Sequence, residues 1–460
     1  MIKTKVLCTI GPASDNSRTI REMVNAGMDA VRINTSHGTP KEYKRTIKRI
    51  RRVGSIPVLL DTAGPQIRLV CKKKTKLAKG KSVKVGFSPA RDLFFSKDFL
   101  REAMPGMHVL LSDGLAEMVI TKRDKREREL TLKALTPVVL DGNMHSNIPS
   151  VYIDLPTLSE RDKEVLRIAK EMEADFINLS FTRRKEDVLA VKKLLKDSGV
   201  GIIAKIENSE GVKNVSEILK EADGIMVARG DLGIEIPSEK VPLVQKSIIR
   251  KCNQAGKIAI VATQMLASMV SNSRPTRAET SDVANAILDG ADCVMLSNET
   301  AVGSYPVGAT RQMKKIARET EAFVRSHIDK KMLTGIPDVV SKSIYNISKH
   351  LAVDKIIAIT KSGFTARMIS RFKPLQEIIA VTDSQCIERK LKLSYGVKPF
   401  YMKKIPEKKK IARVALACFK KGLLEKSNLV IFTAGIYQGK EPTSNTIQIH
   451  KVSNLLQHAR

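Results

Sequence analysis

Three short stretches of the chain place reactive polar residues directly after apolar runs. Lys205 and Glu207 follow the run Ile202 to Ala204, and Asp231 and Thr263 follow the next two runs. A run that is apolar on both faces is typical of a strand buried in a parallel sheet, so charged residues at its exit indicate a site. Neighbouring strands lie about 5 Å apart. Glu207 and Asp231, at consecutive strand ends, could therefore bind one divalent ion with Lys205 beside it.

The elements that position these residues follow one repeated pattern in the first two thirds of the chain. Eight apolar runs, each followed by a polar cluster, predict strands at residues 5–10, 29–33, 58–61, 175–180, 201–206, 224–228, 258–263 and 293–297. The charged segments between them, such as residues 16–26 and 41–53, have helical periodicity. Eight βα units with right-handed crossovers close most economically into a (β/α)8 TIM barrel, whose active sites lie at the carboxyl ends of the strands.

Two departures from this pattern predict two further domains. About 110 residues separate the third run from the fourth, compared with roughly 25 to 35 for one βα unit. Short alternating runs there predict an inserted small β-barrel-like domain, which could act as a lid because its two ends flank the barrel mouth. Strands at residues 355–360, 377–382 and 428–433, separated by helical segments, predict a C-terminal open α/β domain. The predicted domains are residues 1–68 with 152–333 for the barrel, 69–151 for the lid and 334–460 for the C-terminal domain.

Composition narrows the class of protein. A chain of 460 residues is long enough for about two to four domains with an ample core. We expect no signal peptide, because no apolar stretch precedes the first predicted strand, and no membrane span, because the apolar runs are shorter than the roughly 20 residues that one requires. The six cysteines show no paired spacing, and Cys8 and Cys293 lie in apolar runs. These features predict a reduced, cytoplasmic protein.

The net charge of +32 is the strongest anomaly of the composition. An excess of lysine and arginine attracts polyanions. However, only 4% of the residues are aromatic, none is tryptophan, and the basic residues are spread along the chain, which argues against nucleic-acid binding. Both a solvated basic surface and the steering of anionic phosphate substrates are consistent with this charge.

Nine motifs give the chain a resemblance to the pyruvate kinase family over nearly its whole length. They are CTIGPAS (8–14), VRINTSHG (31–38), LDTAGPQIR (60–68), DLP (154–156), IIAKIENSEGV (202–212), VARGDLG (227–233), ATQMLASM (262–269), SRPTRAETSDVANAILDGADCVMLSNETA (273–301) and TKSGFTARMISRF (360–372). The resemblance implies the architecture that the repeats predict, with barrel, lid and C-terminal domain. It also implies a phosphotransferase that moves a phosphoryl group from phosphoenolpyruvate to ADP, giving pyruvate and ATP.

The resemblance assigns catalytic and substrate-binding roles to residues at the strand ends. Lys205 would lie against the transferring phosphoryl group, where a fixed ammonium stabilises negative charge, and Arg32 would contact the phosphate through its guanidinium fork. Backbone amides around Gly230 and Asp231, at the start of a short helix, would meet the substrate carboxylate. Thr263 would lie near the carbon that is protonated. A hydroxyl is too weak an acid to act there alone, so Thr263 would order a chain of water molecules.

The resemblance also implies two sets of oxygen ligands for metal ions. Glu207 and Asp231 would hold Mg²⁺ or Mn²⁺ between the carboxylate and the phosphate of the substrate, since Mg²⁺ takes few protein carboxylates. The second set, for K⁺, consists of Asn34, Ser36, Asp61 and Thr62. Other interpretations stay open at this point, because Lys205 and Glu207 could form a structural salt bridge, and Asp61 and Thr62 could cap a helix.

The remaining assignments concern the nucleotide, the phosphate and regulation. Asn34, His37 and Arg68 match positions on the nucleotide side of the site, although a lone histidine is often structural. Ser180 matches a position near the phosphate but could equally cap its own loop. In the C-terminal domain, residues 360–363 form a small loop before a helix, which could bind a phosphorylated effector or be an ordinary turn. The resemblance further implies a homotetramer.

Several positions depart from the family pattern. Ala63 stands where the family has a lysine, and Gln66 replaces a glutamate near the monovalent site. A Lys-Gly pair in the lid is replaced by Met144-His145, so the lid lysine expected to reach the phosphates is missing. The other departures are Ala267, Asn298 and Val302. Because Gln66 lacks the charge that favours a cation, we expect K⁺ to activate the protein only weakly.

The residues are compatible with three classes of function. The first is a working pyruvate kinase, the second is a catalytically weakened paralogue that acts as a phosphometabolite sensor or interaction protein, and the third is a Mg²⁺-dependent lyase that forms an enolate on a barrel. A lyase function would not explain why the potential K⁺ ligands are present. Retention of Lys205, Glu207, Asp231, Arg32 and Thr263 favours the kinase, since decay usually strikes costly buried charges first.

Overall fold

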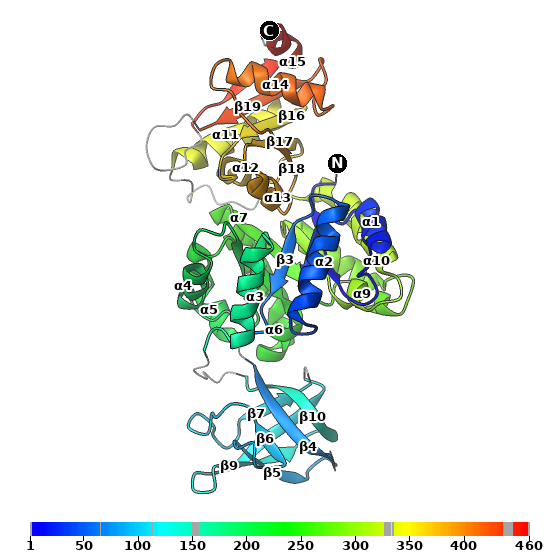
Figure 1. Ribbon diagram of the computed structural model, residues 1–460, viewed down its shortest axis with the longest axis vertical. Coiled ribbons are helices and arrows are strands. Elements are labelled where there is room, and N and C mark those ends of the chain that lie inside the picture. Colours follow the sequence, from blue (N-terminus) through cyan, green and yellow to red (C-terminus); the bar gives the residue numbers. More distant parts are fainter. Residues whose placement is uncertain are drawn as a thin grey trace.

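The computed structural model of the chain describes residues 2–64, 66–112, 114–149, 156–325, 333, 335–435 and 445–458. Three bodies of secondary structure follow one another along the long axis of the molecule (Figure 1). A barrel of strands and helices lies in the middle, a body made of strands lies at one end, and a mixed body of sheet and helices lies at the other. The predicted fold class is thereby confirmed. None of the described helices is long and apolar enough to cross a lipid bilayer.

The central body is a closed barrel of parallel strands. The strands are β1 (Lys5–Ile10), β2 (Ala30–Ile33), β3 (Val58–Asp61), β11 (Phe176–Leu179), β12 (Gly201–Ile206), β13 (Gly224–Ala228), β14 (Ile258–Ala262) and β15 (Cys293–Leu296). Their order around the barrel is β1-β15-β14-β13-β12-β11-β3-β2, and every pair is parallel. Each strand begins and ends within one residue of its prediction, because runs that are apolar on both faces leave little doubt about where a buried strand stops.

Helices connect the strands and cover the outside of the barrel. The long ones are α1 (Ser17–Ala26), α2 (Pro40–Val53), α3 (Glu160–Glu171), α4 (Lys185–Leu194), α5 (Ser209–Glu221), α7 (Val241–Ala255), α8 (Arg277–Leu288) and α10 (Pro306–Thr320). The short ones are α6 (Arg229–Glu235), α9 (Asn298–Ala301), η1 (Ser238–Lys240), η2 (Ala267–Val270) and η3 (Glu321–Phe323). Local interactions determine where the helices begin. The capping box of Thr39 and Glu42, for example, satisfies free N–H groups at the first turn of α2.

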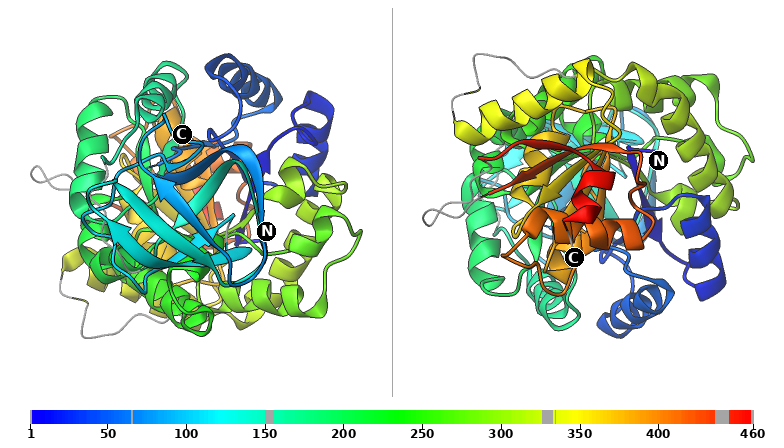
Figure 2. Two further views of the ribbon diagram at one scale, coloured as in Figure 1. Left: turned by 90° about the horizontal axis from the view of Figure 1, so that it is seen from below. Right: turned by 90° about the horizontal axis from the view of Figure 1, so that it is seen from above.

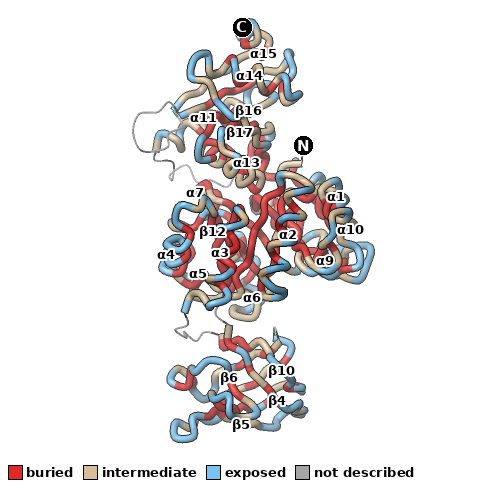
Figure 3. The backbone as a smooth tube through the Cα atoms, viewed as in Figure 1, coloured by how far each residue is buried: buried red, intermediate tan, exposed pale blue. Residues whose placement is uncertain are grey.

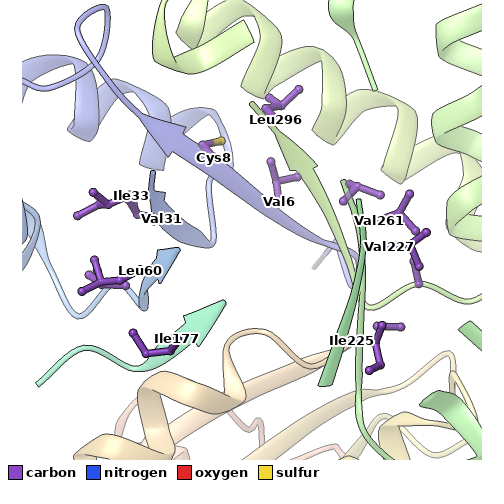
Figure 4. Packing of buried hydrophobic residues seen from close by; sticks show 14 of the residues in the cluster. Val6, Cys8, Val31, Ile33, Leu60, Ile177, Ile225, Val227, Val261 and Leu296 are labelled. Atoms are coloured by element: carbon purple, nitrogen blue, oxygen red, sulfur yellow. The ribbon is translucent and has the colours of Figure 1, made fainter. Parts of the chain in front are cut away.

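The barrel has two apolar layers. In the outer layer, side chains such as Val6, Val31 and Val261 leave the strands towards the helices, as Figure 4 shows. Inside the barrel, a second cluster includes Phe176 and, from the C-terminal domain, Leu393. The strands are therefore buried on both faces, which Figure 3 shows as the buried centre of the molecule. Such double burial explains why most polar residues gather at the strand ends.

The β domain inserted between β3 and α3 forms a second closed barrel. Its strands are β4 (Ile67–Leu77), β5 (Ser82–Gly86), β6 (Leu93–Phe95), β7 (His108–Leu111), β8 (Ala116–Asp124), β9 (Glu129–Ala134) and β10 (Val138–Asn147), in the order β10-β4-β6-β5-β9-β8-β7. The sequence predicts only short strands here, yet β4 has 11 residues and β10 has 10, and they pair with each other. The predicted limit between residues 151 and 152, and Asp154 and Leu155 of the DLP motif, lie outside the described residues.

The C-terminal domain is an open sheet with helices on it. It consists of α11 (Ile336–His350), β16 (Lys355–Ile359), α12 (Phe364–Ser370), β17 (Glu377–Thr382), α13 (Gln385–Leu391), β18 (Val397–Tyr401), α14 (Lys410–Lys420), β19 (Leu429–Ala434), β20 (Gln448–Lys451) and α15 (Val452–Gln457). The strand order is β18-β17-β16-β19-β20, with β20 antiparallel to β19. The sequence analysis missed the two edge strands, because β18 contains a proline and β20 is polar. Residue 334, which opens the predicted domain, lies outside the described residues.

The C-terminal domain packs on the amino ends of the barrel strands. Lys5 Nζ donates to the Val397 carbonyl at 2.8 Å, and Lys373 Nζ lies 2.7 Å from Asp292 Oδ1. The β domain lies at the opposite end of the barrel, where the strands terminate (Figure 1), and the two views of Figure 2 show these two ends separately. The mouth of the barrel therefore faces the β domain, as the sequence predicts for a lid.

Candidate active site

Lys205 lies at the centre of the polar residues at the barrel mouth. Its side chain extends from β12 and is only 10% exposed. Its Nζ lies 2.9 Å from Glu207 Oε1 and 3.4 Å from Asp61 Oδ2, and it donates to Ser180 Oγ at 2.9 Å. Burial alone would lower the pKa of Lys205, but Glu207 and Asp61 outweigh it and raise that pKa. The ammonium group is therefore held in its charged form by the ends of three neighbouring strands.

Asp61, at the end of β3, is the second fixed charge of the site. Arg32 Nε and Nη2 both donate to Asp61 Oδ2, at 2.9 and 2.6 Å, and Asn178 Nδ2 donates to Oδ1 at 2.7 Å. Burial opposes ionisation of this carboxyl, which is 1% exposed, yet Arg32 and Lys205 hold its pKa below the ordinary value. Arg32 is thus anchored on the inner side of the site, with its guanidinium oriented by a carboxylate.

The surroundings of Glu207 raise its pKa, whereas those of Asp61 lower the pKa of that carboxyl. Burial and the negative charge of Asp231 together raise the pKa of Glu207 from 4.5 to about 7, and Lys205 only partly compensates them. The backbone N–H of Phe181 donates to Glu207 Oε2 at 2.7 Å. Two carboxylates that repel each other in a buried place are a favourable binding site for a divalent cation.

The number of available ligands limits what such a cation could be. Among the residues that the structure describes, no group of three or more His, Cys, Asp or Glu side chains could enclose a metal ion. A cation at Glu207 and Asp231 would therefore keep open positions for substrate oxygens and water, which is the coordination that Mg²⁺ prefers. The donor set fits Mg²⁺ or Mn²⁺ and does not fit a closed structural zinc site.

The loops after β3 and β11 interlock beside this centre. Ser180 Oγ donates to the Thr62 carbonyl at 2.7 Å, and the Ser180 N–H donates to Thr62 Oγ1 at 3.0 Å. Gly64 has φ of +74°, and a Cβ at this position would come within 2.8 Å of the Phe181 ring. Only glycine allows the two loops to approach so closely. Ser180 therefore joins the two loops and also accepts a hydrogen bond from Lys205.

Thr263 and Gly230 meet at the end of β14. Thr263 Oγ1 accepts a hydrogen bond from the Gly230 N–H at 2.7 Å and donates to the Ala262 carbonyl at 2.6 Å. Gly230 and Asp231 form the first turn of α6, the short helix that follows β13. The structure therefore brings together, at consecutive strand ends, the residues predicted to meet the substrate carboxylate and the protonated carbon.

The predicted monovalent-ion ligands lie at the ends of β2 and β3, which are neighbours in the barrel, and in the loops that follow them. Ile33 pairs with Leu60, so Asn34, just after β2, is level with Asp61, the last residue of β3. The Thr35 hydroxyl donates to the Asp61 carbonyl, and the Ser36 N–H donates to Asn34 Oδ1 at 3.1 Å. The loop after β2 is thus tied to the end of β3.

The predicted nucleotide residues occupy more exposed places. His37 is exposed, and its carbonyl accepts a hydrogen bond from the Tyr43 hydroxyl at 2.6 Å. Arg68 is exposed at the start of β4 and donates to Gln66 Oε1 at 3.0 Å. The side chain of Gln66, the substituted position near the monovalent site, therefore contacts Arg68 at the junction with the lid.

Contacts between the lid and the barrel involve Asn147 and His145, of which His145 departs from the family pattern. Asn147 Nδ2, at the end of β10, donates to Glu235 Oε1 at 3.1 Å, and burial raises the pKa of Glu235. The ring of His145 lies 6.2 Å from the ring of Phe181, measured between centroids. His145 thus lies next to the loop whose Phe181 N–H contacts Glu207.

Sequence reasoning missed residues that orient the site from inside the barrel. Asn178 is fully buried on β11 and holds Asp61, and Thr9 Oγ1 accepts from Arg32 Nη1 at 3.2 Å. A polar amide within the otherwise apolar stretch 176–179 is the signal that could have identified Asn178. Thr9 gives no such signal, because threonine is common in strands.

Comparisons with known proteins agree with this geometry. A family model described as the barrel domain of pyruvate kinase matches residues 1–310, and one described as its alpha/beta domain matches residues 338–450. The chain is 40% identical to the pyruvate kinase of Staphylococcus aureus (strain USA300) over 474 aligned residues, which cover 99% of this chain and 81% of the relative. It is 41% identical to the pyruvate kinase of Geobacillus stearothermophilus over 479 aligned residues, with the same coverage of both chains. Since the matches include both the barrel with its strand-end residues and the C-terminal domain, this chain belongs to the pyruvate kinase family.

Proposed function

We propose that the protein is a magnesium-dependent pyruvate kinase, which transfers the phosphoryl group of phosphoenolpyruvate to ADP. The observation that carries this proposal is the position of Lys205, whose ammonium group lies between Glu207, Asp61 and Ser180 at the barrel mouth. A fixed, charged ammonium beside a pair of carboxylates suits a reaction in which negative charge builds up on phosphoryl oxygens.

The reaction breaks the bond between phosphorus and the enol oxygen and forms a bond between phosphorus and a terminal oxygen of ADP. Lys205 and Arg32 would stabilise the charge of the phosphoryl group during this transfer. The enolate that remains takes one proton on its methylene carbon and becomes pyruvate. Thr263, held against the Gly230 N–H, would orient the water that delivers this proton.

Glu207 and Asp231 would hold the Mg²⁺ or Mn²⁺ ion in this proposal. The ion would neutralise the carboxylate and phosphate oxygens of the substrate. Burial, and to a smaller extent the charge of Asp231, raise the pKa of Glu207, which supports this assignment because a bound cation stabilises the ionised carboxylate. Gly230 and the N–H groups at the start of α6 would receive the substrate carboxylate, and Ser180 would lie near the phosphate.

The assignments at the edge of the site complete the proposal. Asn34, Ser36, Asp61 and Thr62 would supply oxygen atoms to K⁺, with a weak dependence because Gln66 carries no charge. Asn34, His37 and Arg68 would lie on the side of ADP and ATP. The exposure of His37 and Arg68 is compatible with contact to a nucleotide that enters between barrel and lid.

Other features of the proposal concern the whole chain. We assign residues 1–68 with 152–333 to the barrel, 69–151 to the lid and 334–460 to the C-terminal domain. By analogy with the family we also propose a cytoplasmic homotetramer and a phosphorylated effector at residues 360–363. In that loop Gly363 has φ of +80°, and its N–H donates to Thr360 Oγ1 at 2.9 Å, so the turn is already ordered.

One assay tests the proposed function. The full chain is mixed with phosphoenolpyruvate, ADP, Mg²⁺ and K⁺, and pyruvate is measured through reduction by lactate dehydrogenase. We expect turnover that requires all three of phosphoenolpyruvate, ADP and Mg²⁺. A folded protein that binds phosphoenolpyruvate in calorimetry but forms no pyruvate would contradict the proposal.

A further inference from the structure

The turn after β14 has an uncommon backbone conformation. Thr263 has φ of +70° and Gln264 has φ of +54°, so two successive residues lie in the left-handed region. For a β-branched residue such as threonine a positive φ is a genuine outlier. Such conformations persist only where surrounding contacts hold them, and they concentrate at functional sites. The question is therefore what holds this turn.

Arg229 holds the turn from the side of α6. The buried guanidinium donates through Nη2 to the Thr263 carbonyl at 2.8 Å and to the Gln264 carbonyl at 3.2 Å, and the same Nη2 lies 2.9 Å from Met265 Sδ. Its other terminal nitrogen, Nη1, donates to Asp282 Oδ1 at 2.7 Å. The two carbonyls of the left-handed residues thus share one rigid donor, which is itself fixed by a carboxylate on α8.

Glu299 holds the turn from the opposite side. This carboxylate on α9 is 2% exposed. Its Oε1 accepts a hydrogen bond from the Leu266 N–H at 3.1 Å, and its Oε2 accepts one from the Ser297 N–H at 2.8 Å. The exits of β14 and β15 are therefore joined through one buried acceptor. Arg229 and Glu299 together fix both ends of the four residues from Thr263 to Leu266.

We infer that Arg229 is a positioning residue, and Glu299 its counterpart, which together hold the turn of residues 263–266 in the conformation that aims the Thr263 hydroxyl at α6. The inference rests on the proposed function, in which Thr263 acts at the protonated carbon. Arg229 is itself the first residue of α6, and Gly230 follows it. One side chain therefore couples the helix that carries Gly230 and Asp231 to the turn that carries Thr263.

The geometry explains why lysine should not replace Arg229. Guanidinium is a planar fork that can serve Asp282 on one side and two carbonyls on the other, whereas the lysine ammonium is a single point of charge. With lysine at this position the carbonyls of Thr263 and Gln264 would lose the donor that they share, and the left-handed conformation would lose its main support. The position of the Thr263 hydroxyl would then vary, and a displacement of about 1 Å costs on the order of 100-fold in rate.

The test uses Arg229→Lys in the full chain and a rescue by glycine. Because glycine adopts positive φ freely, Gln264→Gly should remove the backbone strain at position 264, so that the turn depends less on Arg229. The main readout is the exchange of pyruvate methyl protons with D₂O, followed by NMR with Mg²⁺ and ATP present. We expect Arg229→Lys to slow this exchange by roughly 10- to 100-fold, and Arg229→Lys with Gln264→Gly to recover a large part of the loss.

The control is Arg18→Lys, the same substitution at an arginine that pairs with Glu22 on the surface of α1 and takes no part in the turn. The Arg18 side chain is 89% exposed. We expect exchange within about twofold of the wild-type rate, since exposed ion pairs contribute little. If Arg229→Lys does not fold, Glu299→Gln is measured in its place, because it keeps the buried volume but loses one acceptor, and the same slowing is expected.

A second readout does not depend on turnover. Hydrogen exchange followed by mass spectrometry should show faster exchange of the Gly230 and Leu266 amides in Arg229→Lys than in the wild-type chain, and slower exchange again in the double variant. Unchanged proton exchange of pyruvate in Arg229→Lys would overturn the inference, and so would a loss that Gln264→Gly does not recover. A wild-type chain that makes no pyruvate would instead refute the proposed function, and hydrogen exchange would still decide the role of Arg229.

Discussion

Lys205 and Glu207 depend on each other for their ionisation, because both are almost completely removed from water. The Lys205 side chain is 10% exposed and that of Glu207 is 1% exposed, and 2.9 Å separates their charged atoms. The two side chains form a salt bridge in this structure, which is the alternative role that the sequence analysis left open for them. However, Asp61 also approaches Lys205, so the ammonium has more negative partners than a simple pair requires. With Asp231 also near, three carboxylates face the two cations Lys205 and Arg32, and this excess of negative charge would favour a bound metal ion.

Replacement of Lys205 tests the residue that carries the proposed function. Lys205→Met should lower kcat by roughly 100-fold or more, comparable to the loss of one preorganised donor, while phosphoenolpyruvate still binds through the metal site. The fold should persist, because Arg32 continues to compensate Asp61. Steady-state kinetics and calorimetry measure the two effects. Lys220→Met is the matched control, since that lysine pairs with Glu217 on the exposed face of α5. A Lys205→Met variant with most of the wild-type rate would disprove the assignment.

Glu207 predicts a pH dependence of stability in the metal-free protein. The folded chain holds the Glu207 proton more tightly than the unfolded chain does, since burial and Asp231 raise its pKa from 4.5 to about 7. The resulting stabilisation is complete below pH 4.5 and is lost as the pH rises through about 7. Thermal unfolding in EDTA should therefore give a Tm that falls over this range. Glu207→Gln should flatten that fall, and Mg²⁺ should stabilise the wild-type chain more strongly as the pH rises, because only the ionised carboxylate is a ligand.

The monovalent site gives a separate prediction at the residue scale. Gln66 carries no charge and its side-chain oxygen accepts a hydrogen bond from Arg68, so it adds little attraction for a cation. Replacement of K⁺ by tetramethylammonium at constant ionic strength and saturating Mg²⁺ should lower the initial rate only slightly, and Gln66→Glu should increase the effect. A collapse of the wild-type rate by about 100-fold, or about 2.7 kcal/mol, would show that Asn34, Ser36, Asp61 and Thr62 suffice without a charge at position 66.

Some residues of this site can be recognised from the sequence, and others cannot. Lys205, Glu207 and Asp231 are recognisable because charged side chains are rare at the end of apolar runs. Arg229 is not, since its importance depends on which atoms it reaches across the barrel, and Asn178 is marked only by its polar amide in an apolar strand. Roles in substrate and nucleotide binding come from the family resemblance alone, and the structure adds only their neighbours.

At the scale of elements, burial on both faces makes the barrel strands easy to recognise in the sequence. Edge strands are harder to recognise, because they lack that burial. Residues 201–206 and 224–228 were predicted to the residue, because an apolar run there ends abruptly at polar side chains. β18 escaped prediction because Pro399 interrupts its pattern, and its position at the sheet edge explains how the proline is tolerated. No strand is predicted from the sequence at the long strands β4 and β10, and in β4 the consecutive lysines at 72–74 obscure the alternation.

The interlocked loops after β3 and β11 give a prediction about an element junction. Gly64→Ala should destabilise the fold and lower kcat, because its Cβ would press on the Phe181 ring and on Ser180, next to Lys205 and Glu207. Gly80→Ala is the control: its φ of +85° carries a similar backbone strain, but a Cβ there would meet nothing within 4 Å. Both variants should lose about 1 kcal/mol from backbone strain, measured by urea unfolding. Only Gly64→Ala should also lose activity, and equal kinetics in the two variants would contradict the role of this contact.

At the scale of the whole molecule, the two ends of the barrel have different tasks. The C-terminal domain closes the amino ends of the strands with Leu393 and with buried charges, whereas the carboxyl ends stay accessible to the lid. Sequence reasoning placed three domains in the correct order, because each has its own pattern of strands and helices. It could not predict how they pack, since the interdomain contacts join residues such as Lys5 and Val397 that are distant in the chain.

The pair of Lys373 and Asp292 gives the prediction for the molecule as a whole. Lys373 comes from the C-terminal domain, and its side chain is 1% exposed. Asp292, just before β15, also accepts the N–H groups of Ala259 and Tyr395. Lys373→Met should cost about 3 to 5 kcal/mol, because it leaves a buried carboxylate without its counter-ion. Adding Asp292→Asn should recover part of that loss.

The measurement is urea unfolding of the full chain, followed by circular dichroism and by activity. With Lys373→Met we expect the C-terminal domain to unfold at lower urea than the barrel, so that one transition becomes two. Lys246→Met is the control, since its ion pair with Asp289 lies on the surface with the lysine side chain 51% exposed, and its loss should cost less than about 1 kcal/mol. If Lys373→Met and Lys246→Met unfold alike, the buried pair does not join the two domains, and other contacts, such as the Lys5 hydrogen bond to Val397 and the apolar contact of Leu393, hold them together.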